Sequence, residues 1–298
     1  MSSPQPVAFI EGEYVSLGDA KISILDTGFF RSDVVYDVVS TWKGLFFRLD
    51  DHVERFQASA AGLRMECPHD APRIKRILAE CVQRGGLEDA YVYMALTRGP
   101  YRGHDLLQFD PNFIAFAIPY VWLIPREEQE VGSSLLVAET PRIASASVEA
   151  RFKNHHWGDL TRAQLEALDA GAETAILCDP AGNLSEGPGF NIFFIKDGRL
   201  LTPRANVLEG ITRKTVFDLA GELEIPAEAG DYPADALRGA DEAFICTTAG
   251  GIMPITRVDG KLLGDDKPGP LSTQLRTLYW AKREAGWLGT PVADLIET

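Results

Sequence analysis

The sequence predicts an α+β protein with two domains. Short apolar runs typical of strands open each half of the chain, and runs with helical apolar periodicity follow them. Between the halves, Ile124–Glu130 loses all apolar periodicity and gathers charged residues and a proline, as surface connections between domains do. We therefore expect a small N-terminal domain at residues 1–123, a linker at 124–133 and a larger domain at 134–298.

Strand-like runs dominate the start of the first half. Lys43-Gly44 joins two of these runs as a two-residue hairpin turn. The last two runs are separated by a connection too long and irregular for a turn, and long ordered loops often carry function. The runs lie at Val7–Leu17, which holds two short strands around Glu11-Gly12, and at Ala20–Leu25, Tyr36–Trp42, Leu45–Leu49, Tyr91–Thr97 and Phe113–Val121.

Two helices are predicted between these strands. The first begins with Asp50 as its N-cap, and the second runs from Pro72 to Arg84 and ends at Gly85-Gly86. Their buried faces are expected to hold Val53, Phe56, Ala60 and Leu63 in the first helix, and Ile74, Ile77, Leu78, Cys81 and Val82 in the second.

The second half alternates strands with helices. One helix is expected after Lys153, with Leu160, Leu165 and Leu168 on one face and Gly171 as its stop. The other predicted elements are strands at Ser134–Glu139, Thr174–Cys178, Asn191–Ile195 and Glu242–Cys246, hairpins turned by Asp197-Gly198 and Asp259-Gly260, and helices at Thr212–Leu223 and Pro270–Gly286.

Composition excludes several classes of function. The net charge of −14 with no basic run argues against nucleic acid and against anionic membranes, since both need clustered Lys and Arg. No apolar run approaches the length of a membrane span, and no secretory signal is seen, so we expect a cytoplasmic protein. The four cysteines are widely spaced and form no metal-binding pattern. His155 and His156 are adjacent and have no carboxylate or cysteine nearby in the sequence pattern to complete a ligand set, so no metal site is expected.

One lysine and one glutamate stand out. Lys153 precedes a helix rather than lying inside one, so its amine can face a cleft. Glu186 precedes Gly187-Pro188-Gly189, which no ordinary strand carries unless the backbone must bend or approach something closely.

Four separated motifs then give a specific resemblance. They are Lys153, the run Ser185–Asn191, the run Leu208–Arg213, and the run Cys246–Ile255. Together they resemble the fold type IV pyridoxal-phosphate aminotransferases, which include branched-chain aminotransferases, D-amino acid transaminases and (R)-selective amine transaminases. The resemblance spans nearly the whole chain. It implies a small α/β domain, a larger β-barrel-like domain with helices, and pyridoxal 5'-phosphate as cofactor.

The resemblance also implies roles for the motif residues. Lys153 would hold the cofactor as an imine and move the α proton, and Glu186 would keep the pyridine nitrogen protonated. The phosphate would take backbone donors at a helix start and a fixed cation, Arg48. The remaining cofactor residues implied are Trp157, Gly189, Phe190, Asn191, Gly210, Ile211, Thr212, Thr247 and Thr248.

The substrate residues are suggested by branch-specific patterns. Tyr36-Asp37-Val38 resembles the (R)-amine and D-amino acid branches, whereas branched-chain enzymes carry phenylalanine-glutamate-glycine there. Arg102-Gly103-His104 resembles the loop with which D-amino acid transaminases hold a carboxylate, and Arg31 is a second candidate contact. Thr248 and Ala249 complete the expected substrate residues.

Alternatives remain at this stage. A branched-chain L-amino acid aminotransferase, or a lyase of the same fold such as 4-amino-4-deoxychorismate lyase, would share the lysine and the phosphate site. A cofactor-binding protein without activity is a more distant alternative.

The resemblance further implies a homodimer in which the loop at 98–110 reaches the neighbouring site.

Overall fold

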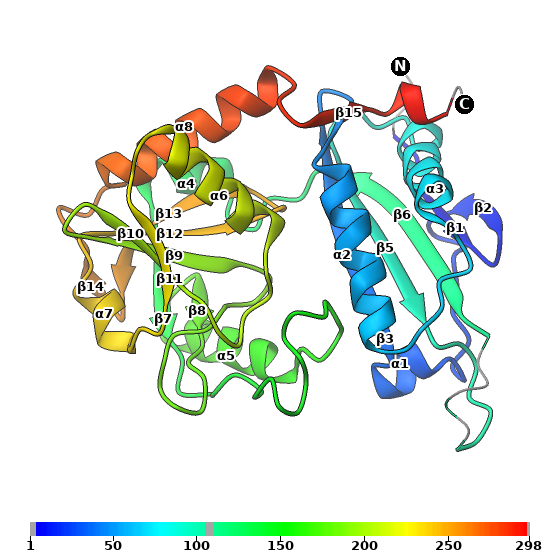
Figure 1. The fold of residues 1–298 in the computed structure, drawn as a ribbon, viewed down its shortest axis with the longest axis horizontal. Helices are drawn as coiled ribbons and strands as arrows, with labels where there is room; N and C mark the ends of the chain where they lie inside the picture. Colours follow the sequence, from blue (N-terminus) through cyan, green and yellow to red (C-terminus); the bar gives the residue numbers. More distant parts are fainter. Residues whose placement is uncertain (1–3, 105, 107–109, 297–298) are drawn as a thin grey trace. The chain divides into compact units, whose positions relative to one another are not determined.

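The computed structural model describes residues 4–104, 106 and 110–296, which form two compact units. The first contains the chain up to Val121, together with Phe152–His155 and the segment from Arg283 onward. The second contains Trp122–Arg151 and His156–Lys282. Each unit has its own sheet and its own helices, which confirms the α+β prediction (Figure 1). Two segments from the second half of the sequence thus belong to the first unit.

The sheet of the first unit is antiparallel throughout, with the strand order β15-β4-β3-β5-β6-β1-β2. The hairpin predicted at Lys43-Gly44 joins β3 to β4, as expected. The strands are β1 (Val7–Ile10), β2 (Glu13–Ser16), β3 (Val34–Trp42), β4 (Leu45–Phe47), β5 (Ala90–Thr97), β6 (Asn112–Pro119) and β15 (Gly289–Pro291).

Two helices, α2 (Leu49–Gly62) and α3 (Ala71–Arg84), pack on this sheet and bury a common apolar core. Both were predicted, and the core includes all five expected residues of α3. The N-terminus of α3 is capped by Asp70, whose side chain accepts the N–H of Arg73. The unit also holds the short helix α1 (Thr27–Arg31) and the 3₁₀ helix η1 (Ala293–Leu295).

Two local predictions in this unit are wrong. No strand forms at 20–25, because a turn at Ser23–Asp26 interrupts the run and leaves Ile24 and Leu25 exposed. Asp50 is not the N-cap of α2. Arg48 is the N-cap, with φ of 51°. Asp50 lies in the first turn of the helix, where the helix dipole stabilises a negative charge.

The second unit has a mixed sheet with the order β11-β10-β9-β12-β13-β7-β8, and β14 pairs with β13. Both predicted Asp-Gly hairpins are present, between β9 and β10 and between β13 and β14. The strands are β7 (Ser133–Val137), β8 (Thr174–Ile176), β9 (Asn191–Lys196), β10 (Arg199–Pro203), β11 (Ala227–Gly230), β12 (Glu242–Thr247), β13 (Gly251–Val258) and β14 (Lys261–Leu262).

Helices cover this sheet. Helix α5 packs against β7 and β8, and α6 packs against β11 and β12. The helices are α4 (Arg126–Val131), α5 (Gly158–Asp169), α6 (Ile211–Glu222), α7 (Ala234–Arg238) and α8 (Pro270–Glu284), the last of which ends in the first unit. Among the helices in the described part of the chain, none has the length and apolar character to cross a bilayer.

The second unit departs from expectation at two places. The segment 124–133, expected as a linker, contains α4, and Ile124 and Gln129 are buried there. The apolar face of α5 is formed by Leu160, Ala163 and Ala167, whereas Leu165 and Leu168 are exposed. Ala163 and Ala167 pack closely against the sheet. The prediction is therefore correct for Leu160 and wrong for Leu165 and Leu168, which lie on the exposed side of the helix.

Candidate active site

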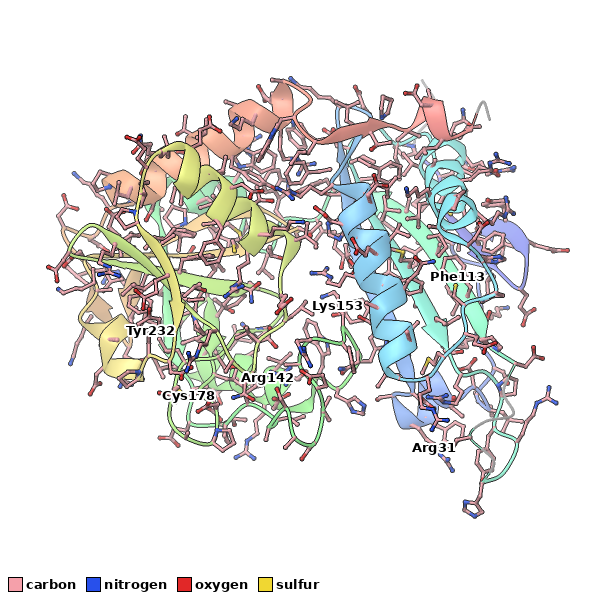
Figure 2. All side chains as sticks on the ribbon, in the orientation of Figure 1. Arg31, Phe113, Arg142, Lys153, Cys178 and Tyr232 are labelled. Carbon is pink, nitrogen blue, oxygen red and sulfur yellow. The ribbon has the colours of Figure 1, made fainter. Side chains whose placement is uncertain are left out.

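Lys153 is held at the edge of β3 in the first unit. The N–H of Tyr36 donates to the carbonyl of Lys153 at 3.0 Å, and the N–H of Lys153 donates to Oγ of Ser59 in α2 at 3.1 Å. Nζ of its side chain lies 4.5 Å from the centroid of the Tyr36 ring. Lys153 is labelled in Figure 2. The lysine predicted to be reactive is therefore fixed at its backbone and placed over an aromatic face.

Tyr36 begins a row of aromatic rings across the sheet. Its ring stacks on Tyr93 at 5.4 Å, and Tyr93 stacks on Phe116 at 4.8 Å. His155 completes the row, since its Nε2 lies 2.6 Å from the hydroxyl of Tyr93 and its ring lies 4.7 Å from that of Tyr36. Val38 is two residues beyond Tyr36 on β3 and so faces the same side of the sheet.

A charged cluster lies behind this face, on α2 and β3. The carboxylate of Asp37, fully buried, accepts two bonds from Arg55, at 2.8 and 2.9 Å, and lies 2.8 Å from Nδ1 of His52. Burial alone would raise the pKa of Asp37, but Arg55 and His52 bring it far below its usual range. Burial lowers the pKa of His52; Asp37 opposes this, while Arg55 and Lys153 add to it.

This cluster was missed at the sequence level, although a signal was available. Arg48, His52, Arg55 and Ser59 recur at spacings of four, three and four residues, which places them on one face of a helix. Arg48, the predicted phosphate arginine, donates from Nη1 to Asp51 at 2.8 Å, and its guanidinium lies 5.6 Å from the ring of Trp287. The guanidinium of Arg55 and the amine of Lys153 both act to lower the pKa of His52.

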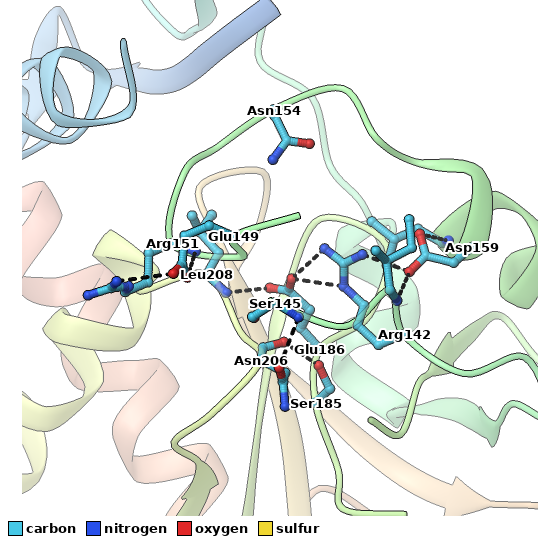
Figure 3. Close-up of polar contacts among 12 residues, drawn as sticks. Arg142, Ser145, Glu149, Arg151, Asn154, Asp159, Ser185, Glu186, Asn206 and Leu208 are labelled. Atoms are coloured by element: carbon cyan, nitrogen blue, oxygen red, sulfur yellow. Dashed lines mark hydrogen bonds and ion pairs between the residues drawn. The ribbon is translucent and has the colours of Figure 1, made fainter. Parts of the chain in front are cut away.

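Glu186 lies in the second unit within another buried cluster. Its Oε1 accepts from Nη2 and Nε of Arg142 at 3.0 and 3.2 Å, and its Oε2 accepts the N–H of Leu208 at 2.8 Å (Figure 3). Nη1 of Arg142 reaches Asp159 at 2.7 Å, and that carboxylate also accepts the N–H of Ile143. Both oxygens of Glu186 are thus positioned by fixed donors.

Arg142 was not among the residues singled out from the sequence, because no motif surrounds it. Burial alone would lower its pKa, but Glu186 and Asp159 raise it above the ordinary arginine value. When all three groups are ionised, the cluster carries one net negative charge. A negatively charged cluster of this kind favours the protonated, positively charged form of a group placed beside it.

The backbone beside Glu186 makes the close approaches that its glycines predicted. A Cβ at Gly187 would lie 2.0 Å from Cζ of Phe190, and Gly189 has φ of +83°. Asn191 donates to the carbonyl of Leu208 at 2.9 Å, and its Oδ1 leaves no room for a Cβ at Gly210. These contacts join Glu186 to the segment that leads into α6.

The start of α6 and the end of β12 offer donors for an anion. Gly210 is the N-cap of α6, so Ile211 and Thr212 occupy the first helical positions, where N–H groups lack partners within the helix. Thr248 and Ala249 form the turn after β12, which ends at Thr247. Helix α6 packs against β12, and Arg213 of α6 acts to lower the pKa of Cys246, which burial raises.

The loop at 98–110, which was predicted to bind the substrate, is anchored at its base in the first unit. The N–H of Thr27 donates to Gly99 and that of Tyr101 donates to Leu25, which ties the loop to α1. Arg31 of α1 stacks on Tyr101, with its Cζ 4.4 Å from the ring centroid.

Two described residues beyond this anchor are the predicted carboxylate contacts. Arg102 is 59% exposed and lies 3.4 Å from Asp110, and His104 is exposed as well. The predicted loop at 98–110 includes residues 105 and 107–109, which lie outside the described residues.

The first unit thus holds a lysine amine at an aromatic face, and the second unit holds a buried carboxylate cluster and a helix N-terminus. The chain belongs to the class IV amino-transferase family, whose pattern matches residues 34–258. Members of this family depend on pyridoxal phosphate, and the chain is a transaminase acting on amino acids and 2-oxo acids.

Individual relatives differ in substrate. The chain is 30% identical to the D-alanine aminotransferase of Listeria innocua over 91% of its own length and 93% of that protein. It is also similar to the branched-chain aminotransferase of Thermoproteus uzoniensis with norvaline, with a TM-score of 0.88, 28% identity, and 96% and 99% of the two chains covered. The branched-chain amino acid aminotransferase of Escherichia coli gives a TM-score of 0.87 and 25% identity, over 93% and 94%.

The residues of each unit fit the cofactor. Pyridoxal phosphate supplies an electron sink for the amino group transfer when it is bound. In the second unit, the Glu186 cluster offers a negative charge for a protonated ring nitrogen, and the start of α6 offers donors for a phosphate. In the first unit, Lys153 offers the amine, and its anchored backbone limits where that amine can reach.

Proposed function

We propose that this transaminase moves an amino group between a D-amino acid or an (R)-primary amine and a 2-oxo acid such as pyruvate. The observation that carries the proposal is the Tyr36 ring beside the Lys153 amine, with Val38 on the same face of β3. The tyrosine-aspartate-valine run resembles the D-amino acid and (R)-amine branches. The similarity to D-alanine aminotransferases supports this proposal, and the similarity to branched-chain enzymes keeps L-leucine as the competing substrate.

Single-turnover half-reactions test the proposal directly. The enzyme with bound cofactor is mixed with D-alanine, with (R)-1-phenylethylamine and with L-leucine, and the cofactor absorbance is followed. Faster conversion by D-alanine or by the (R)-amine is expected. A preference for L-leucine would overturn the proposal in favour of a branched-chain enzyme.

A lyase of the same fold is the second candidate. Both reactions use a reactive lysine and a phosphate site, so the cofactor residues do not separate them. The Arg102-Gly103-His104 loop favours transfer, because it offers donors for the carboxylate of an incoming acid. Turnover of a D-amino acid that depends on added pyruvate supports a transaminase, whereas release of pyruvate from an aminodeoxychorismate substrate would indicate the lyase.

We propose the following roles at the cofactor. Lys153 binds it covalently and moves the α proton, and Glu186 holds the ring nitrogen protonated. The phosphate is bound at Gly210, Ile211, Thr212, Thr247 and Thr248, and the ring is lined by Trp157, Gly189, Phe190 and Asn191. Borohydride reduction followed by peptide mapping should label Lys153. A label on Lys196 or Lys214 instead would contradict the assignment.

The cation for the phosphate is the one role that we reassign. Arg48 is engaged with Asp51 and Trp287, whereas Arg55 shares the carboxylate of Asp37 with His52, and both Arg55 and Lys153 lower the pKa of His52. We therefore propose Arg55 in place of Arg48.

The carboxylate of the substrate is proposed to meet Arg102 and His104, with Arg31 as a further contact and Thr248 and Ala249 beside it. Arg31 is the more fixed of the two arginines, because it stacks on Tyr101 and Phe30, at 4.4 and 5.2 Å to the ring centroids. Arg102 is exposed, and its ion pair with Asp110 is long at 3.4 Å, so it can turn to a ligand at small cost.

We also propose a homodimer. Large apolar side chains are exposed around α1 and the substrate loop, a pattern that marks interaction surfaces. They are Ile24, Leu25, Phe29, Phe30, Tyr101 and Leu106. A second copy of the chain that covers them would bring the loop toward a neighbouring site. Sedimentation should give twice the chain mass, and an active monomer would contradict the proposal.

A cytoplasmic location is proposed as well. Cys67, Cys81, Cys178 and Cys246 are all free thiols, as suits a reducing compartment. Fractionation of cells that express the protein should recover it in the cytoplasm.

A further inference from the structure

Helix α2 carries two kinds of side chain on two buried faces. One face is apolar and belongs to the core of the first unit. The other is polar, and it is nearly as deeply buried, since His52 is 2% exposed and Ser59 is 1% exposed. A buried polar face on a helix requires partners for its groups. The partners of this polar face come from β3 and from residues 152–155, which we call the lysine segment.

The lysine segment occupies an open edge of β3. Strand β4 pairs with β3 only at Thr41 and Trp42, so the opposite end of that edge is available to another segment. Asn154 forms an antiparallel bridge with Val35 there, and the N–H of Tyr36 donates to the Lys153 carbonyl. This pairing explains why residues 152–155 belong to the first unit although both flanking segments belong to the second.

Helix α2 fixes the same segment from its other side. Oγ of Ser59 accepts the N–H of Lys153 at 3.1 Å, so both backbone groups of the lysine are engaged. One turn further on, the ring of Phe152 lies against Gly62, where a Cβ would be only 2.2 Å from Cζ of the ring. Only glycine therefore allows Phe152 to occupy this place.

The side-chain amine is also within the electrostatic range of α2. The groups that face His52 are Asp37 on β3, Arg55 on α2 and Lys153, and all three influence its pKa. Because Nδ1 of His52 is bound to Asp37, the ring cannot turn independently of the sheet. The helix thus contributes, together with β3, to the backbone position of Lys153 and to the charges near its amine.

We propose that α2 positions the Lys153 amine, with Ser59 and Gly62 as positioning residues that act through the backbone of Lys153 and the ring of Phe152. The proposal rests on the proposed function, in which Lys153 binds the cofactor. It implies that small changes on α2 alter the chemistry at Lys153 without removing any reacting group.

Gly62→Ala is the main test, with Gly221→Ala as its matched control. Both glycines lie near the end of a helix, but a Cβ at Gly221 meets nothing within 4 Å. A displacement of about 1 Å at a reacting group costs about 10²-fold in rate, and we expect a loss of this order for Gly62→Ala with KM largely unchanged. The pH titration of the bound cofactor absorbance should shift as well. Gly221→Ala should match the parent in both measurements.

A second substitution separates a positioning role from general damage. Phe152→Leu on the Gly62→Ala background makes room for the added methyl group and should restore most of the rate and the parent titration. Ser59→Ala should shift the titration in the same direction as Gly62→Ala, and it keeps the proposal testable if Gly62→Ala does not fold. Unchanged titrations in both single variants, or no recovery in the double variant, would overturn the proposal.

The test also distinguishes this proposal from the proposed function. Borohydride mapping of the parent enzyme reports only whether Lys153 is the residue that binds the cofactor. A label elsewhere would reject the proposed function. A label on Lys153 together with parent-like Gly62→Ala and Ser59→Ala variants would reject the role of α2 alone. Reactivity of Lys153 toward an amine reagent in the cofactor-free protein gives a third readout, and Gly62→Ala is expected to change it.

Discussion

The guanidinium of Arg142 donates two hydrogen bonds to a single oxygen of Glu186, from Nη2 at 3.0 Å and from Nε at 3.2 Å. The other oxygen of Glu186 accepts the N–H of Leu208. A carboxylate held on both oxygens can rotate little, so its direction is set before any ligand arrives. The arginine that sets this direction lies 44 residues earlier in the chain.

Replacing Arg142 should therefore strongly destabilise the second unit. Arg142→Met leaves Glu186 and Asp159 buried without their cation, and removal of one partner from a buried pair costs about 3–5 kcal/mol. Arg204→Met is the control, because its pair with Asp231 is exposed and worth about 1 kcal/mol or less. Denaturant unfolding measures both. Equal losses would show that the Arg142 cluster is not a buried ion pair in solution.

Glu186→Gln is expected to bind the cofactor and yet to slow the half-reaction by about 10²-fold or more, because an electrostatic stabiliser of the ring is lost. Glu149→Gln provides the control, since Glu149 is paired with Arg151 at an exposed site. Stopped-flow absorbance with the preferred donor measures both variants. If Glu186→Gln turned over like the parent, the proposed role at the ring nitrogen would be wrong.

Arg48, the N-cap of α2, and Arg55, within the helix, should differ in their effect on cofactor affinity. Lysine keeps the charge but loses the guanidinium fork, and a hydrogen bond to a charged group is worth about 1.5–3 kcal/mol. Arg55→Lys should therefore raise the dissociation constant of the cofactor by about tenfold or more, and Arg48→Lys should leave it nearly unchanged. Equilibrium titration of the cofactor-free variants measures this. The reverse order would restore Arg48 as the phosphate arginine.

Arg102→Ala should discriminate between two donors. D-Alanine carries a carboxylate that the arginine can bind, so its half-reaction is expected to slow by one to two orders of magnitude, in line with about 1.5–3 kcal/mol. The half-reaction of (R)-1-phenylethylamine should suffer less, because this substrate has no carboxylate. Single-turnover rates with both donors give the comparison. Equal losses would place Arg102 outside the carboxylate site.

The Asp37–His52 pair should make the first unit sensitive to acid. Burial lowers the pKa of His52, so its contribution to stability is complete above its unfolded pKa of about 6.5 and is lost as the pH falls through the lower folded pKa. The pKa of Asp37 is lowered too, by Arg55 and His52 against the effect of burial, and its contribution is lost below about pH 4.

His52→Asn tests this dependence, because an asparagine amide can still donate to Asp37 but does not titrate. Between pH 6.5 and pH 5, the parent should lose up to about 1.4 kcal/mol of unfolding free energy per pH unit through His52, and the variant should show a flatter profile. His104→Asn changes an exposed histidine and should reproduce the parent profile. Parallel profiles for His52→Asn and the parent would contradict the assignment.

Periodicity predicted most of the fold, and it failed where a neighbouring element decides the outcome. Apolar spacing placed α3 correctly, because Ile74, Ile77 and Leu78 face the core of their own unit. It failed in α5, where Ala163 and Ala167 pack against the sheet and Leu165 stays exposed. Apolar residue size alone does not reveal which side of a helix has a close neighbour.

In the candidate site, too, features set by local sequence could be predicted, and features set by tertiary contacts could not. Glycine spacing predicted the close approach at Gly187, because local sterics determine it. Arg142 and Asp37 could not be identified in this way. Their importance comes from charges that only the tertiary fold brings together, and neither residue lies in a motif whose chemistry is evident by itself.

The discontinuous first unit has a consequence for synthesis on the ribosome. Its sheet gains β15 at Gly289–Pro291, and its β3 edge gains the segment at residues 152–155. At translation rates of about 5–20 residues per second, the stretch between Val121 and Gly289 takes roughly 10 to 30 s to emerge. During that interval the nascent N-terminal sheet has open edges at β3 and β4, which are available to chaperones or to misplaced strands. The protein can complete its first unit only after the last segment has left the ribosome.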